Sequence, residues 1–341
     1  MIIERIEHVD PKTGVRVLQL TSFPLIHYHQ YCYGQWISPD CTTLLLFGYR
    51  EPRRDSPVDL WRVNSDGSDL ALVAKGASWS TISVDGKHVY AGRGGSILRI
   101  PLLGEGEEEV FRSPEYVGML VGAASLDGRY VFGHARRTDG KHELLRLDLT
   151  DGSAVRLFET DYLMHVQLHN EGPGQLLATV RPPGKEWGIW TFSFDGEDFR
   201  KLPFTRSTNH FASLGMTGKV ITSVTGGGKA IEVARPGDAA ATILAQGDGF
   251  WHPTCDASGE WIASDTNWPD TGLMLVHAPS GRYRPLCFTG ASGGHPQWTH
   301  AHPRMAPDAR YVVFDSDATG ICQVYLAFVP DEFKAELRKG A

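Results

Sequence analysis

A short pattern that returns seven times along the chain constrains the fold more than any other feature of the sequence. Each copy has a polar turn, such as SPD, SVDG or SLDG, followed by a run of alternating apolar and polar residues. The copies begin near residues 37, 82, 124, 169, 215, 256 and 306, a spacing of roughly 40–50 residues that is typical of propeller blades. A second strand-and-turn motif with Asp-Gly or Ser-Gly, as in ELLRLDLTDGSAV, follows most copies and indicates tight hairpins. We therefore predict an all-β fold, a seven-bladed β-propeller.

The two ends of the chain support a closed ring. Segment 13–22 (TGVRVLQLTS) has the pattern of an outer strand whose blade lacks its inner strands, and segment 323–330 (QVYLAFVP) ends a blade that lacks its last strand. Joining the two segments in one blade would close the ring and remove an exposed strand edge. No linker interrupts the repeats, so we predict that residues 1–341 form a single domain, which ends in a short helix or a frayed tail.

Composition and charge narrow the range of partners and compartments. The formal charge of −7 is spread along the chain, whereas a nucleic-acid partner would require a basic patch. The sequence contains no run of 18 apolar residues, so we predict no membrane span. Glu4, Arg5 and Glu7 lie in the region where a secretory signal peptide needs an apolar core. The five cysteines form no CxxC pair, which favours reduced thiols. We expect a cytoplasmic monomer or small homo-oligomer that binds neither nucleic acid nor membrane.

Histidines occupy a similar position in four successive repeats. His302 lies nine residues before Tyr311, His252 lies nine before Trp261, and His210 lies ten before Val220. His165 occupies a comparable place one repeat earlier. Because each blade begins with the strand that lines the central channel, these histidines should converge on one side of that channel.

The segment QWTHAHP, residues 297–303, adds further ligand atoms at the same level. His300 and His302 are two residues apart and would share a face of an extended strand, while Gln297 would contribute an amide oxygen. Imidazoles with one amide oxygen and no thiolate suit a borderline divalent ion such as Mn, Fe, Ni or Zn. The alternative is a set of structural histidines that form hydrogen bonds with neighbouring strands.

Several motifs together resemble the oligogalacturonate lyases of the seven-bladed propeller type. They are HPxxxxxGxWIxxDT from His252, QWTHAHP at 297–303, SDATGxxQVYLA at 316–327, HVQ at 165–167, IWTFSFDGEDFRKL at 189–202 and TGVRVLQLT at 13–21. The similarity extends over nearly the whole chain. It implies a Mn²⁺ ion held by His252, Gln297, His300 and His302, and His210 as the catalytic base.

The resemblance also implies a reaction, the β-elimination used in pectin degradation. A base removes the proton at C5 of a uronic acid, the sugar linked at O4 leaves, and a 4,5-unsaturated uronate forms. This proton is too weakly acidic for an unaided imidazole, so a cation on the carboxylate must stabilise the developing charge. A neutral histidine then accepts the proton near pH 7.

Two positions depart from the family pattern and put the substrate in question. Family members have an arginine where this chain has Gly188, and a glutamate follows their catalytic histidine where this chain has Phe211. The family arginine that is absent here would position the uronate or neutralise its charge. Arg181, Lys185 and Arg206 are candidates to replace it, and the alternative is that they are solvated surface charges.

Other channel residues complete the predicted substrate side. His165 belongs to the same level of the channel, and Trp79 occupies the blade-two position equivalent to His252. We predict that both contact the sugar, with Trp79 as a stacking platform. Tyr31 and Tyr33 precede the inner part of the first repeat and are interpreted mainly as packing residues, with sugar stacking as the alternative.

Two other functions fit the same sequence. A non-catalytic platform of the TolB type would show the same turns, because the fold does not fix the function. A different metal-dependent reaction on a modified sugar would use the same histidines. A third possibility is a peptidase propeller separated from its hydrolase, but no hydrolase domain of the GxSxG type is recognised in this sequence.

Overall fold

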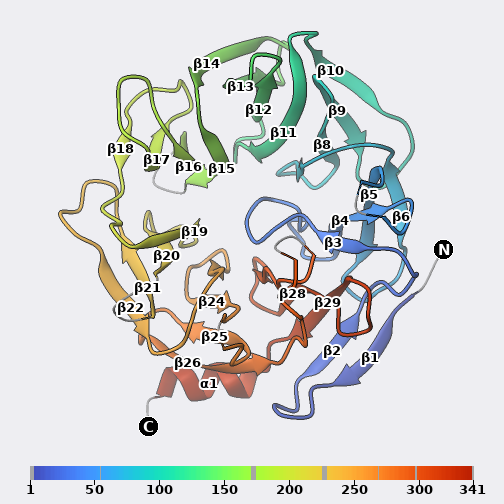
Figure 1. The fold of residues 1–341 in the computed structure, drawn as a ribbon, viewed down its shortest axis with the longest axis vertical. Coiled ribbons are helices and arrows are strands. Elements are labelled where there is room, and N and C mark those ends of the chain that lie inside the picture. The colour runs from blue at the N-terminus through green and yellow to red at the C-terminus, as the bar shows by residue number, and fades with distance from the viewer. Residues whose placement is uncertain are drawn as a thin grey trace.

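The computed structural model describes residues 4–53, 55–169, 174–224, 229–267, 269–295 and 298–339. In these residues twenty-nine strands form seven antiparallel sheets, and one helix follows the last strand. The sheets stand around a central axis as the blades of a propeller (Figure 1). The predicted seven-bladed β-propeller is confirmed.

Blades one to six each contain four strands, ordered from the channel to the rim as they occur in the chain. The predicted repeats are the hairpins between the first and second strands of the blades. The strands of blades one to three are β3 (His27–His29), β4 (Thr43–Tyr49), β5 (Val58–Asn64) and β6 (Ala71–Ala74); β7 (Ser80–Ile82), β8 (His88–Arg93), β9 (Ser96–Pro101) and β10 (Glu108–Arg112); β11 (Tyr116–Ala124), β12 (Tyr130–Arg137), β13 (His142–Asp148) and β14 (Ala154–Thr160).

Blades four to six follow the same order around the ring. Their second strands are buried along almost their whole length, because each blade packs between two others. The strands are β15 (Leu163–His169), β16 (Gln175–Val180), β17 (Gly188–Ser193) and β18 (Arg200–Lys201); β19 (Ser207–Ser213), β20 (Val220–Val224), β21 (Ala230–Ala234) and β22 (Thr242–Gln246); β23 (Thr254–Cys255), β24 (Trp261–Ser264), β25 (Leu273–His277) and β26 (Arg282–Cys287).

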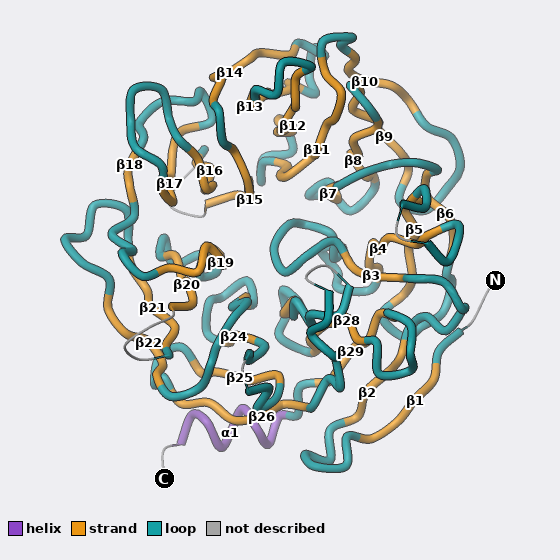
Figure 2. The backbone as a smooth tube through the Cα atoms, viewed as in Figure 1, coloured by secondary structure: helices purple, strands orange, loops and turns teal. Residues whose placement is uncertain are grey.

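Blade seven joins the two ends of the chain, as predicted. Its inner strands are β27 (Arg304–Met305), β28 (Tyr311–Ser316) and β29 (Gln323–Phe328), and its outer strands are β2 (Arg16–Gln19) and β1 (Ile6–Val9). Strand β2 pairs with β29 in antiparallel register, with Leu18 opposite Leu326. Strand β1 extends this blade by one strand beyond the prediction (Figure 2).

The C-terminal segment is a helix, α1 (Asp331–Lys339), which packs against β25. Acidic residues in its first turn and basic residues in its last turn complement the helix dipole. Phe333 and Leu337 are buried, and Arg338 forms an ion pair with Glu260. Within the described residues, no helix is both long and apolar enough to span a bilayer.

Candidate metal centre

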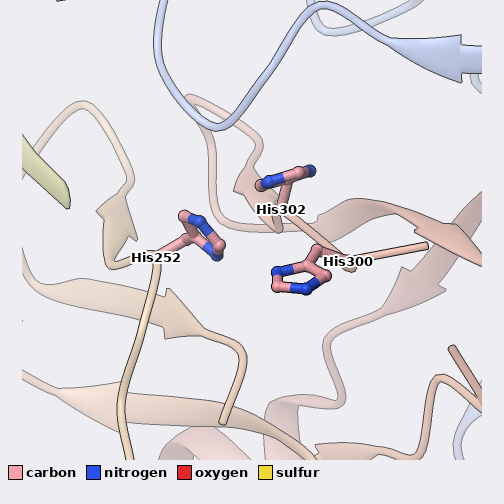
Figure 3. Close-up of side chains that lie close together, drawn as sticks. All are labelled: His252, His300 and His302. Atoms are coloured by element: carbon pink, nitrogen blue, oxygen red, sulfur yellow. The ribbon is translucent and has the colours of Figure 1, made fainter. Parts of the chain in front are cut away.

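Three histidines meet at one mouth of the channel, the end at which the inner strands β23 and β27 begin. One ring nitrogen from each of His252, His300 and His302 lies within 4.8 Å of the others. Figure 3 shows the three rings facing a common space. Such imidazoles, with no thiolate among them, suit a borderline divalent ion. We call these three residues the histidine triad, and this end of the channel the triad mouth.

A buried carboxylate fixes the orientation of His252. Asp265, which follows β24, accepts hydrogen bonds from the His252 backbone N–H (2.8 Å) and from Nδ1 (2.8 Å). This leaves Nε2 as the nitrogen available to a metal, an arrangement common in metalloproteins. Burial tends to raise the pKa of Asp265, but the charge of His252 and its hydrogen bonds outweigh burial and lower it. The carboxylate therefore remains ionised.

His300 and His302 converge for a different reason from the one predicted. They lie in a loop before β27 rather than in a strand, and His302 adopts a left-handed backbone with φ of 43°, which is uncommon for a non-glycine residue. Between them, Ala301 O accepts a hydrogen bond from Asp315 N (2.9 Å), which fixes the loop. Gln297 lies outside the described residues, so its role as a ligand stays a prediction.

His210, the predicted base, lies beside the histidine triad. Its ring centroid is 4.2 Å from that of His252 and 5.1 Å from that of Trp251. The pairing of β19 with β20 shifts register between Ser207 and Phe211. Such irregularities often change the direction of side chains at functional sites. Burial, with the neighbouring histidines, lowers the pKa of His210 to about 2, so its imidazole is neutral at pH 7.

A loop from blade one crosses the channel toward blade five. Residues 30–36, which we call the channel loop, project into the centre of the ring between β3 and β4 (Figure 1). Gln30 Nε2 donates to Ser80 Oγ (2.7 Å), and Gln35 Oε1 accepts from Ala124 N (2.8 Å). Blades two and three therefore hold both ends of the loop in place.

Tyr31 of the channel loop contacts the candidate base, a role that the sequence did not predict. Its hydroxyl is 3.1 Å from His210 Nδ1, and its ring centroid is 4.7 Å from that of His302 and 5.7 Å from that of His252. The residue packs, as expected, but it also links the candidate base to the metal ligands. The position of the Tyr31 ring depends on a backbone φ of 97°, which the local sequence does not predict.

A pocket of about 420 Å³ opens beside the triad mouth, on the side of blades two to four. Trp79 lines this pocket and packs against Tyr31, with ring centroids 6.0 Å apart. None of the described residues in the lining is a lysine, an arginine or a carboxylate; they are Gln30, Tyr31, Tyr33, Gly34, Trp36, Trp79, Ser80, Leu120, Val121, Gly122, His134, His142, Leu163, Met164, His165 and Val166. We call it the aromatic pocket.

His165 reaches the aromatic pocket through an irregularity in β15. Its φ is 62°, and the register with β16 shifts between Met164 and Gln167. The ring stacks on Tyr31 with centroids 5.8 Å apart, and burial lowers its pKa to about 4. Its Nδ1 atom is enclosed and has no hydrogen-bond partner among the described residues, while the residue as a whole lines the pocket.

The three predicted substrate cations do not line the aromatic pocket. Arg181 and Lys185 are exposed, and Arg206 forms an ion pair with the buried Glu232. Their contact with substrate stays a prediction, and it would require a ligand that extends beyond the pocket.

The two departures from the family pattern have visible structural consequences. A Cβ at Gly188 would lie 2.8 Å from Lys201 Cε, so the lysine side chain occupies the space into which an arginine would extend. Phe211 is buried, and its ring is 5.9 Å from that of His165. A hydrophobic contact thus replaces a carboxylate next to the candidate base.

Some known proteins resemble this chain in sequence or in fold. No family model matches the chain. An oligogalacturonate lyase from Dickeya dadantii (strain 3937) is 24% identical over 94% of this chain and 95% of that protein. The chain resembles the oligogalacturonate lyases along nearly its whole length.

Two solved structures of oligogalacturonate lyases share the fold. One, a complex with manganese, superposes with a TM-score of 0.82 and 19% identity over 98% of each chain. Another, from Vibrio parahaemolyticus, superposes with a TM-score of 0.81 and 18% identity, again over 98% of each chain. The match with these lyases therefore includes the complete ring of blades, whereas most residues differ.

Proposed function

We propose that this protein is a divalent-metal-dependent lyase that cleaves uronate-containing oligosaccharides by β-elimination, with His210 as the base. The observation that carries the proposal is the meeting of three imidazoles around one point with the ring of His210 4.2 Å from that of His252. The resemblance to the oligogalacturonate lyases supports the reaction class.

His252, His300 and His302 would hold the ion, with Gln297 as the predicted fourth ligand. The fit rests on the donor set: three imidazoles converge, and Asp265 fixes the tautomer of His252. A bound divalent ion such as Mn²⁺ supplies Lewis-acid stabilisation of the charge that develops on the uronate carboxylate. The manganese complex of a structural relative supports this choice of ion.

His210 would take the C5 proton at Nε2. In the tautomer in which Nδ1 donates to the Tyr31 hydroxyl (3.1 Å), Nε2 carries the lone pair that can accept a proton. Tyr31 then orients the ring and accepts the hydrogen bond that strengthens as the imidazole becomes positively charged. His210 is enclosed by Trp251 and Tyr31, which keeps the imidazole neutral until substrate delivers its proton.

The aromatic pocket would hold the sugar attached to the reacting uronate. Trp79 offers a flat face for stacking, and the ring of His165 lines the pocket next to it. Because none of the described residues that line this pocket is a lysine or an arginine, a second carboxylate there would lose hydration without gaining an ion-pair partner. We therefore favour a mixed oligosaccharide, in which a neutral sugar is next to the uronate, over a chain of uronates alone.

The test is an elimination assay with Mn²⁺ and two sets of substrates, oligogalacturonates and oligosaccharides that alternate uronate with neutral sugar. Cleavage should produce the ultraviolet absorbance of a 4,5-unsaturated uronate, more strongly with the mixed set, and mass spectrometry should find the unsaturated product.

His210→Ala should lower the rate by about 10²–10⁴-fold, the contribution of a general base, and it should retain the metal. His295→Ala is the matched control, because His295 stacks on Trp298 outside the histidine triad. Absence of unsaturated product from both substrate sets, or an unchanged rate in His210→Ala, would contradict the proposal and favour a binding platform or another reaction at the same metal.

A further inference from the structure

A second pocket, of about 240 Å³, opens at the opposite mouth of the channel. It lies between the turns that join the first and second strands of several blades, and Leu126, Met216, Ala257 and Pro307 come from these turns. We call this end the turn mouth. No member of the histidine triad lines the pocket.

Among the described residues that line this pocket, one is a cation, and no described residue is its counter-ion. The guanidinium of Arg304, on β27, forms no hydrogen bond or ion pair with any described residue, and its Nε atom is fully enclosed. Arg304 is partly buried, and burial of a charge without a partner is unfavourable. An anion that enters the pocket would therefore gain this guanidinium as its charge partner.

The groups around Arg304 do not neutralise it. Cys255 lines the same pocket, and burial raises the pKa of its thiol to about 12, so the thiol is uncharged. Asp256 also lines the pocket, but its oxygens accept hydrogen bonds from Trp261 N (2.8 Å) and from Ser258. The hydrogen bonds of the Asp256 carboxylate therefore stay within its own turn, and the carboxylate lies beyond ion-pair distance of Arg304.

The lining indicates which anion fits. A single arginine offers a planar fork that matches one carboxylate, whereas a phosphate dianion would need further cations. Leu126 and Met216 are exposed large apolar side chains at the turn mouth, with 52% and 60% of their surface accessible. Together with Pro307 they form an apolar rim next to the charge.

We propose that the turn mouth is a binding site for a small organic monocarboxylate with an apolar body, with Arg304 as its charge partner. The carboxylate meets the guanidinium inside the pocket, and the apolar body contacts Leu126, Met216 and Pro307 at the rim. The site is separate from the triad mouth and does not depend on the proposed lyase activity.

The test uses the full-length, metal-loaded protein and three probes: benzoate, its neutral analogue benzamide, and inorganic phosphate. Calorimetry should show one benzoate per chain and thermal melting should shift upward with benzoate, whereas benzamide and phosphate should have little effect. Arg304→Met should weaken benzoate binding at least tenfold. Without ligand, this variant should melt no lower than the wild type, because it loses an unpaired charge.

Three further variants keep the test decisive. Met216→Trp should obstruct the pocket and weaken benzoate binding while Arg304 stays in place. Arg310→Met, which removes a cation paired with Asp308 near the same mouth, should bind benzoate as the wild type does. His252→Ala should also bind benzoate normally, which separates this site from the metal.

Three results would overturn the inference. They are equal binding of benzoate by wild type and Arg304→Met, binding of benzamide as tight as that of benzoate, and loss of binding in His252→Ala. A clear drop in the melting temperature of ligand-free Arg304→Met would also count against it, because it would mean that the arginine already has a stabilising partner.

Discussion

The two sides of the triad mouth are built from opposite kinds of residue. On the side of blades five to seven, His210, His252, His300 and His302 lie close together, and the buried carboxylate of Asp265 bonds to His252. On the side of blades two to four, aromatic and aliphatic side chains enclose a pocket whose described lining carries no lysine, arginine or carboxylate.

This difference separates chemistry from recognition. The histidine side contains the predicted metal ligands and the predicted base, together with one departure from the family pattern, Phe211 in blade five. The other departure, Gly188 in place of the family arginine, lies on the other side, in blade four. We infer that the reaction class is retained and that the sugar bound next to the reacting uronate has changed. Variants on the two sides should therefore affect different kinetic parameters.

The largest effect is expected from the histidine side. His252→Ala removes a metal ligand and its link to Asp265, so activity should fall by about 10³-fold or more, since electrostatic stabilisation by metals and preorganised donors is often worth that much. Metal content measured by elemental analysis should fall with the rate. Retention of both metal and activity would show that the histidines are structural.

The pH dependence of kcat/KM tests the environment of His210. Its lowered pKa, about 2, keeps the imidazole unprotonated as the pH falls, so saturating Mn²⁺ should give a nearly flat profile from pH 8 to pH 5. An ordinary histidine with a pKa of 6.5 would lose about 30-fold of its basic form over this range. A decline of that size, with metal occupancy unchanged, would contradict the enclosed neutral base.

Tyr31→Phe tests the link between the two sides. The variant keeps the ring that packs on His302 but removes the hydroxyl 3.1 Å from His210. Loss of one orienting hydrogen bond of about 1 kcal/mol should reduce kcat about fivefold to tenfold without changing metal affinity. Tyr33→Phe is the control and should retain full kcat; equal effects in both variants would argue for packing alone.

The smallest effect is expected on the recognition side. Trp79→Ala should raise KM about fivefold to tenfold through the loss of a stacking surface worth about 1 kcal/mol, with kcat nearly unchanged. Arg181→Ala, an exposed residue outside the pocket lining, should change KM less than about twofold. A larger effect of the arginine than of the tryptophan would reverse our assignment of the substrate side.

The sequence was sufficient for the ring but not for the details of the channel. The blades and the pairing of β2 with β29 follow from the alternation of apolar and polar residues and from the turn residues, both of which can be read in the sequence. His252 and His302 were found because the repeat places them at equal distances from the next strand.

The channel loop could not be predicted because its position depends on distant contacts. Gln30 bonds to Ser80 and Gln35 bonds to Ala124, and Tyr31 requires a left-handed backbone. None of these is visible in a local pattern. The same holds for His302, whose orientation comes from an unusual φ rather than from strand alternation, and for Arg304, whose lack of a partner emerges only when the blades are assembled.

The most direct test of the central claim is a titration of Mn²⁺ followed by electron paramagnetic resonance, comparing the wild type with His302→Ala and with His295→Ala. We predict that the wild type and His295→Ala each remove one Mn²⁺ per chain from the signal of free Mn²⁺, whereas His302→Ala removes much less. Equal uptake by all three proteins, or no uptake by the wild type, would contradict a metal centre at the triad mouth.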